Sequence, residues 1–199
     1  ATGFASAFTV RVQRLRLLEG FCPPFTEAVE MPSRIARWSD ACGRANIAGG
    51  VADRRAARPV MDSKAAAADR LMRVNPRLSQ DIANELAESF TEGNGEGVSW
   101  RFDPLHRTPS AKGYLQIEAE AFWRNIKAPP LCIWGEHGFR PGGIEARQSK
   151  LPGAQSRWLE GAGHNLHHEQ PELIARAAHA FFSDDALPVE LTDIPEHAR

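Results

Sequence analysis

The 199 residues are enough for one domain with its own core, or for one domain that carries an inserted cap. The formal net charge is −1 and charged residues are interspersed, so no field recruits nucleic acid or an anionic membrane. No apolar run approaches the roughly 20 residues of a transmembrane helix. We therefore expect neither a nucleic-acid nor a membrane partner.

The cysteines and the first residues favour a reducing, cytoplasmic setting. Cys22, Cys42 and Cys132 are widely spaced and odd in number, which argues against a disulfide framework or a zinc site. The first twenty residues lack the apolar stretch and the cleavage site of a signal peptide.

The chain opens with the end of a helix and a strand. Residues 3–8 are small and apolar, as at the end of a helix, and residues 12–20 carry three leucines before a glycine, which predicts a strand that ends at a turn. A turn-rich segment follows at 22–32.

Four helices are predicted next. They span 32–43, 63–74, 79–90 and 113–126. Ser79 is the expected N-cap of the third helix. The apolar faces are predicted to be Ile82, Leu86 and Phe90 on the third helix, and Leu115, Ala119, Phe122 and Ile126 on the fourth. The segment 44–63 has few large apolar residues and predicts a loop; 91–97 predicts a turn and 98–104 a short extended piece.

The pattern changes at residue 129. Residues 129–138 are apolar without alternation, which predicts a strand buried on both faces in a parallel sheet. The pattern then predicts a helix and turn at 142–154, a strand from 155 and a helix at 170–182. The apolar face of that last helix is predicted to be Ile174, Ala178, Phe181 and Phe182.

The order strand, helical block, strand, helix, strand, helix predicts an α/β fold with parallel strands. We divide the chain into the start of the core (1–24), a helical cap (25–127), the C-terminal α/β core (128–182) and an acidic tail (183–199) that is expected to be poorly ordered.

Two stretches carry a resemblance to a known family. "PLCIWGEHG" (130–138) and "LEGAGHNLHHEQPELIARAAHAFF" (159–182) resemble the C-terminal end of α/β-hydrolase-fold enzymes, in their serine-hydrolase-like esterase branch. The resemblance implies a partial α/β-hydrolase fold with parallel strands and an inserted helical cap. It also implies that His164, in the G-x-G-H loop 161–164, is the catalytic histidine. The substrates implied are small-molecule esters, and this chemistry needs no cofactor.

The chain departs from that family in two places. The nucleophile elbow G-x-S-x-G occurs nowhere in the 199 residues. If residues 1–8 end the helix after the elbow, the nucleophile would precede this segment. The usual acid position after the penultimate strand holds Gly138, so Glu19 and Glu136 are the alternatives. Glu19 is favoured slightly, because its strand end should face the same rim as His164.

Other interpretations of these residues stay open. His164 is otherwise a surface loop histidine, and His164 with His168 is an i,i+4 pair that would suit a metal, although H-E-x-x-H is absent. The aromatic residues of the cap are expected to pack, with one or two lining an acyl or alcohol pocket: Trp38, Trp100, Phe102, Phe122 and Trp123.

The leading hypothesis is an ester (acyl) hydrolase that uses Ser-His-acid chemistry, with this chain alone inactive because it lacks the nucleophile. The alternative is a truncated or degenerate, non-catalytic relative that is inert or acts as an interaction module. Self-association through an exposed sheet edge is expected in either case.

Overall fold

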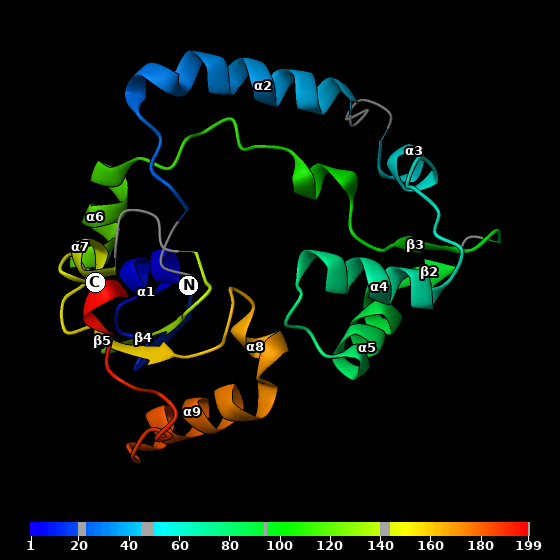
Figure 1. The fold of residues 1–199 in the computed structure, drawn as a ribbon. Helices are drawn as coiled ribbons and strands as arrows, with labels where there is room; N and C mark the ends of the chain where they lie inside the picture. The colour runs from blue at the N-terminus through cyan, green and yellow to red at the C-terminus, as the bar shows by residue number, and fades with distance from the viewer. Residues whose placement is uncertain (20–22, 45–49, 94, 140–143, 199) are drawn as a thin grey trace. The chain divides into compact units, whose positions relative to one another are not determined.

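The computed structural model describes residues 1–19, 23–44, 50–93, 95–139 and 144–198. They form two compact units (Figure 1). Unit 1 comprises Ala1–Phe25 and Tyr114–Arg199, and unit 2 comprises Thr26–Gly113. Each unit has its own hydrophobic clusters and is described separately. Among the described helices, none is long and apolar enough to cross a membrane.

Unit 1 is built on a parallel sheet of three strands in the order β1-β4-β5. The strands are β1 (Leu15–Leu18), β4 (Pro130–Gly135) and β5 (Gln155–Leu159). Leu17 pairs with Cys132, which in turn pairs with Ser156. The parallel arrangement predicted from the unbroken apolar run is confirmed.

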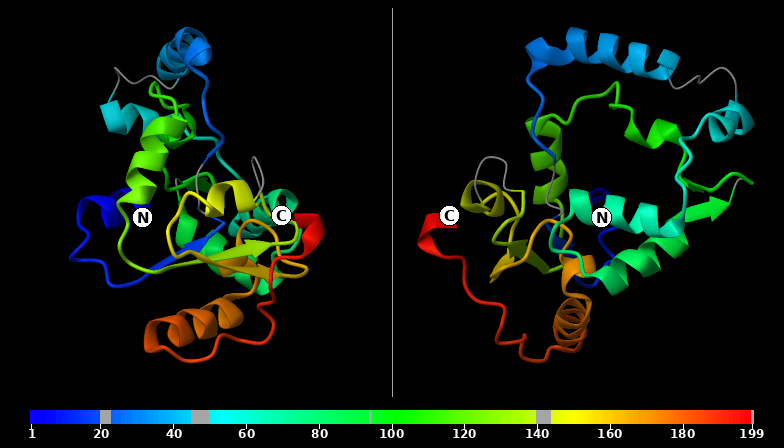
Figure 2. Two further views of the ribbon diagram at one scale, coloured as in Figure 1. Left: turned by 90° about the vertical axis from the view of Figure 1, so that its left-hand side faces the viewer. Right: turned by 45° about the vertical axis from the view of Figure 1, so that its right-hand side comes forward.

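The central strand β4 is buried along its whole length. Leu131 and Ile133 pack in the cluster that includes α9 (Pro171–Ser183), whereas Cys132 and Trp134 point to the opposite face. Figure 2 shows α9 on one side of the sheet and α1 and α6 on the other. Helices on both faces explain why this strand shows no alternation of apolar and polar residues.

In the described residues of unit 1, six helical segments accompany the sheet. They are α1 (Thr2–Ala7), α6 (Gln116–Arg124), α7 (Ile144–Gln148), α8 (Leu166–Glu169), α9 and the 3-10 helix η4 (Glu196–Ala198). Helix α6 lies within the segment 25–127 that the sequence assigned to the cap, but its packing places it in unit 1. Ala119 and Ile126 of the predicted apolar face are buried, but the large buried aromatic is Trp123, which is 1 % exposed, and not Phe122, which is 47 % exposed.

The tail is packed, and the prediction that it is poorly ordered is wrong. Thr192 and Trp158 exchange two backbone hydrogen bonds of 2.8 and 3.0 Å, and Leu191 and Ala198 are buried. At the outer edge of a sheet, a strand has backbone N–H and C=O groups that no further strand can bond. On β5, the tail bonds those of Trp158 through Thr192.

Unit 2 is mainly helical. Its elements are η1 (Ala28–Glu30), α2 (Met31–Arg44), α3 (Gly50–Ala56), α4 (Lys64–Val74), α5 (Gln80–Phe90), the antiparallel strands β2 (Thr91–Gly93) and β3 (Val98–Trp100), and η3 (Pro104–Arg107). The hydroxyl oxygen of Ser63 accepts the Ala66 N–H at 3.1 Å, and that of Ser79 accepts the Ile82 N–H at 3.3 Å. The predicted N-cap of α5 is therefore confirmed.

Three details of unit 2 differ from the sequence-based expectation. The segment 44–63, predicted to be a loop, contains α3, and the predicted turn 91–97 begins with β2. The buried face of α5 is formed by Ala83 and Ala87, while Phe90 is 42 % exposed. Small side chains let α4 and α5 approach closely, so the alanines lie at their contact and the larger residues flank it.

The cysteines are divided between the units. Cys42 and Cys132 are free and buried, and burial raises the pKa of the Cys132 thiol to about 12, so this group is an inert packing residue. Cys22 lies outside the described residues.

Candidate active site

The candidate site lies where the strands of unit 1 end. Glu19 directly follows β1, Gly135 ends β4, and the loop after β5 carries His164. The carboxyl ends of parallel strands meet at one edge of a sheet, so three loops far apart in sequence converge there. The structure brings Glu19 and His164 together: Nδ1 of the imidazole lies 3.3 Å from Oε2 of the carboxylate.

Glu19 is a buried carboxylate whose two oxygens are both bonded. Its side chain is fully shielded from solvent. Oε1 accepts the N–H of Gly135 at 2.5 Å and Oε2 accepts that of Phe139 at 2.8 Å. Burial raises the pKa of Glu19, and these two bonds and His164 oppose the rise. The carboxylate is therefore fixed in one orientation toward the imidazole.

The backbone at Glu19 is also unusual. Its φ of 50° places a residue with a full side chain in the left-handed region. Non-glycine residues adopt this conformation at a cost, and such residues cluster at functional sites. Here the conformation turns the carboxylate back over the end of β4, where the Gly135 N–H meets it.

The carboxylate of Glu19 explains why the usual acid position holds a glycine, Gly138. A Cβ at residue 138 would lie only 2.0 Å from Oε1 and 2.2 Å from Oε2 of Glu19. The carboxylate of Glu19 thus fills the space that a side chain at position 138 would need. An acid is accommodated at one of the two positions, not at both.

Glu136, the second carboxylate considered from the sequence, has a different partner. Its Oε2 accepts the N–H of Gly161 at 2.8 Å and lies 3.6 Å from Nε2 of His137. It supports the turn that leads into the His164 loop, whereas Glu19 contacts the imidazole itself.

A third carboxylate, Glu169 of α8, was missed in the sequence. Its Oε2 accepts the N–H of Gly163 at 2.6 Å, and its Oε1 accepts that of Asn165 at 3.3 Å. A Cβ at residue 163 would lie 2.8 Å from Oε1, so any larger residue there would displace the Glu169 carboxylate. Glu169 thereby holds the backbone on both sides of His164. No signal in the sequence marked Glu169, because its partners are backbone N–H groups.

The imidazole of His164 combines a fixed side with an open one. Its side chain is 56 % exposed, and it meets the ring of Phe139 edge-on, with centroids 6.5 Å apart. With Nδ1 at Glu19, Nε2 is the nitrogen available to a reacting group. This arrangement suits a general base that an acid orients.

The neighbouring histidines have other contacts. His167 and His168 lie in α8 with ring centroids 4.0 Å apart, and burial, followed by the charge of His167, lowers the pKa of His168. In the part of the chain that the structure describes, no three His, Cys, Asp or Glu side chains are grouped to hold a metal.

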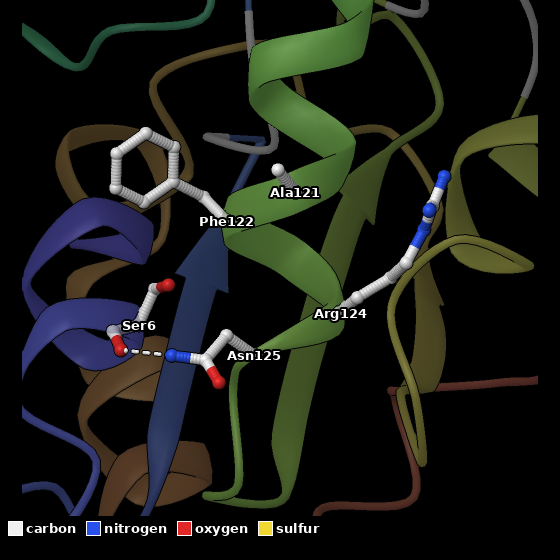
Figure 3. A pocket seen from close by; sticks show the side chains of 5 residues that line it. All are labelled: Ser6, Ala121, Phe122, Arg124 and Asn125. Carbon is white, nitrogen blue, oxygen red and sulfur yellow. Dashed lines mark hydrogen bonds between the residues drawn. The ribbon is translucent and has the colours of Figure 1, made fainter.

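A hollow between α1 and α6 is separate from this site (Figure 3). It has a volume of about 440 Å³, and Asn125 crosses it to donate a 2.7 Å hydrogen bond to the carbonyl of Ser6. Neither Glu19 nor His164 lines it. Its one cation, Arg124, is paired with Glu120. We therefore assign it no part in the site.

The sheet and its strand-end site define the class of protein. Helices cover both faces of a parallel sheet, and this chain has an α/β-hydrolase fold. Its sequence is similar to that of curated carboxylesterases. No family model matches the sequence.

Solved structures support the fold over most of the chain. A hypothetical protein, PA1622, from Pseudomonas aeruginosa is 26 % identical and superposes with a TM-score of 0.76, over 92 % of this chain and 63 % of its own. A thioesterase domain from the curacin biosynthetic pathway is 24 % identical, with a TM-score of 0.68, over 88 % of this chain and 58 % of its own.

Two curated relatives come from Bacillus subtilis. The carboxylesterase YbfK is 27 % identical over 88 residues, which is 43 % of this chain and 30 % of that protein. The uncharacterized carboxylesterase nap is 26 % identical over 103 residues, which is 50 % of this chain and 34 % of that protein. This chain thus matches about a third of the length of these relatives.

Proposed function

We propose that this chain carries the acid–base pair of an ester (acyl) hydrolase, with His164 as the general base and Glu19 as the acid that orients it. The observation that carries the proposal is the 3.3 Å contact between the two side chains at the ends of parallel strands. The names of the curated relatives, both carboxylesterases, support the choice of an ester substrate.

The geometry suits the proton transfers of ester hydrolysis. A serine hydroxyl would lose its proton to Nε2 of His164 while its oxygen attacks the ester carbonyl. Glu19 would hold the Nδ1–H and stabilise the imidazolium, which then returns the proton to the leaving alcohol. The acyl-enzyme formed in this way is hydrolysed by water, which His164 activates in the same manner. No cofactor takes part in these steps.

The nucleophile is the missing component of this proposal. No G-x-S-x-G is present in the 199 residues, so we propose that the nucleophile is supplied from outside them and that this chain alone does not turn over esters. We further propose that unit 2, which holds most of the segment 25–127, serves as the cap of the complete enzyme.

Hydrolysis of p-nitrophenyl acetate and butyrate tests the division of roles. The chain and its His164→Ala variant should both stay at background. In a polypeptide that joins this chain to a nucleophile elbow, His164→Ala should lower kcat by about 10⁴-fold, with His167→Ala as the near-neutral control. Turnover by the chain alone that His164→Ala abolishes would reveal another nucleophile. If His164→Ala and His167→Ala lowered kcat equally in the joined polypeptide, the result would favour the non-catalytic alternative.

The acid assignment has a test that needs no turnover. ¹⁵N NMR of the imidazole should find the proton on Nδ1 of His164 when the ring is neutral. Glu19→Gln should shift the tautomer balance toward Nε2–H, because the carboxylate that accepts the Nδ1 proton is gone. Glu136→Gln is the matched control and should leave the balance unchanged. If the two variants change the spectrum alike, Glu19 does not hold the role.

A further inference from the structure

A cavity within unit 2 has a lining of a different kind. It has a volume of about 510 Å³, and its residues come from the segment after α3, from α4, from β3 and from the segment around η3. Trp100 and Phe102 supply aromatic surface, and Arg58, Arg70 and Arg107 supply positive charge. Among the described residues that line it, there is no aspartate or glutamate. The volume is typical of a small-molecule site.

One of the three arginines is part of the wall. The side chain of Arg58 is 8 % exposed, pairs with Glu92 and donates a 2.5 Å hydrogen bond to the Trp100 carbonyl. Its charge is matched and its position is fixed. Arg58 therefore stabilises β3, and only Arg70 and Arg107 of the lining arginines remain to bind a negatively charged ligand.

Arg70 and Arg107 are free to act on a ligand. Both are exposed, and neither forms an ion pair with any carboxylate in the described residues. The guanidinium of Arg107 lies 5.3 Å from the centroid of the Phe102 ring, which stacks on Trp100 at 6.1 Å with an interplanar angle of 18°. A cation thus sits directly beside a stacked aromatic surface.

We infer that this cavity binds an organic anion with an apolar body, of the class of medium-chain carboxylates. The carboxylate lies between Arg70 and Arg107, because guanidinium groups pair with carboxylates by charge-assisted hydrogen bonds. The hydrocarbon chain packs on Leu71, Trp100 and Phe102. The inference is independent of the proposed hydrolase activity, since neither Glu19 nor His164 lines this cavity.

Calorimetry on the full chain tests this inference, with octanoate, 1-octanol and inorganic phosphate as the probes. Octanoate should bind saturably and at least about tenfold more tightly than either of the others, because only octanoate offers both the charge and the apolar chain. Arg70→Gln and Arg107→Gln should each weaken octanoate binding about tenfold and leave the weak binding of octanol unchanged. Phe102→Ala should weaken both.

Arg73→Gln is the matched control, because Arg73 lies on the same helix, is exposed, and does not line the cavity. It should leave octanoate affinity unchanged, and melting curves should show that all variants fold. The inference is overturned if octanoate shows no saturable binding, if octanol or phosphate binds as tightly, or if Arg73→Gln weakens binding as much as Arg70→Gln.

Discussion

The charged groups of the two candidate sites, one in each unit, differ in their burial and in their hydrogen bonding. In unit 1 the carboxylate of Glu19 is buried, and both of its oxygens are bonded to backbone N–H groups and an imidazole. In the cavity of unit 2, Arg70 and Arg107 are exposed and face no carboxylate of the described lining. A fixed, bonded charge can orient a reacting group without reorganising, whereas an open charge is available to a ligand. This contrast agrees with our two proposals, that the first site serves proton transfer and the second serves the binding of an anion.

The largest expected effect concerns the sheet that carries the site of unit 1. Among the described strands, β1 has a neighbour only on the side of β4, whereas the tail bridges the outer edge of β5. An unpaired strand edge recruits another chain, so we expect dimers or larger species. Size-exclusion chromatography with light scattering should give a mass at least twice 21.9 kDa. A monomer with a sharp, cooperative melt would contradict this.

Gly138→Asp tests whether a second carboxylate can be placed beside the buried carboxylate of Glu19. The new side chain would occupy the space of the Glu19 carboxylate, so we expect a loss of about 3 kcal/mol or more in the free energy of unfolding. In a Glu19→Ala background the same substitution should cost much less, and a double-mutant cycle in urea measures the difference. Additive losses would show that the two positions do not share this space.

Glu169→Ala tests the support of the His164 loop. It removes the acceptor for the N–H groups of Gly163 and Asn165, which should cost about 2 kcal/mol. Glu172→Ala is the matched control on the exposed side of α9 and should change the free energy of unfolding by less than about 0.5 kcal/mol. Equal effects in the two variants would mean that Glu169 is not a support.

Ser79→Ala probes unit 2 by the same measurement. The substitution removes the cap of α5, and the expected loss is about 1 kcal/mol. The ester-hydrolysis roles are assigned to unit 1, so the ¹⁵N spectrum of His164 should stay as it is. A change in that spectrum would show that the two units are coupled.

Glu19→Gln should have the smallest effect, and it depends on pH. Burial raises the pKa of Glu19 above its ordinary value of 4.5. Between that value and the folded pKa, the unfolded chain releases a proton that the folded chain keeps, so the stability falls as the pH rises through this window. Melting temperatures across about pH 4 to 8 should lose this decline in Glu19→Gln but retain it in Glu85→Gln. A decline that persists in Glu19→Gln would place its origin in another group.

The sequence predicted elements best where local signals agreed. The helices after Ser63 and Ser79 combine a capping serine with an apolar period, and the run at 131–134 is apolar on both faces, so all three elements were found. Helix α3 was missed because it has only seven residues, with two arginines and few large apolar side chains. The apolar faces of α6 and α9 were predicted in part, since Ala119, Ile174 and Phe181 are buried, whereas Phe122 and Phe182 are half-exposed. On α5 the prediction favoured large side chains, and the buried residues are Ala83 and Ala87.

The candidate site was also predicted only in part from the sequence. Reasoning from strand ends brought Glu19 and His164 to one rim, because parallel strands end at one edge. The sequence could not explain the glycine at 138, since the group that excludes a side chain there lies 119 residues away in the chain. Glu169 was missed because its partners are backbone N–H groups, which leave no mark in the sequence.

The mutual exclusion of Glu19 and a side chain at 138 restricts how such a site can change during evolution. Moving the acid from one loop to the other takes two substitutions, and their order matters. If an acid appears at 138 first, two carboxylates compete for one space and the fold is damaged. If Glu19 is lost first, the N–H groups of Gly135 and Phe139 lose their acceptor and His164 loses its carboxylate partner, but no two carboxylates compete for one space. Under the roles that we propose for Glu19 and His164, this second order passes through a stage of weakened activity, so the shift is open only to lineages that tolerate such a stage.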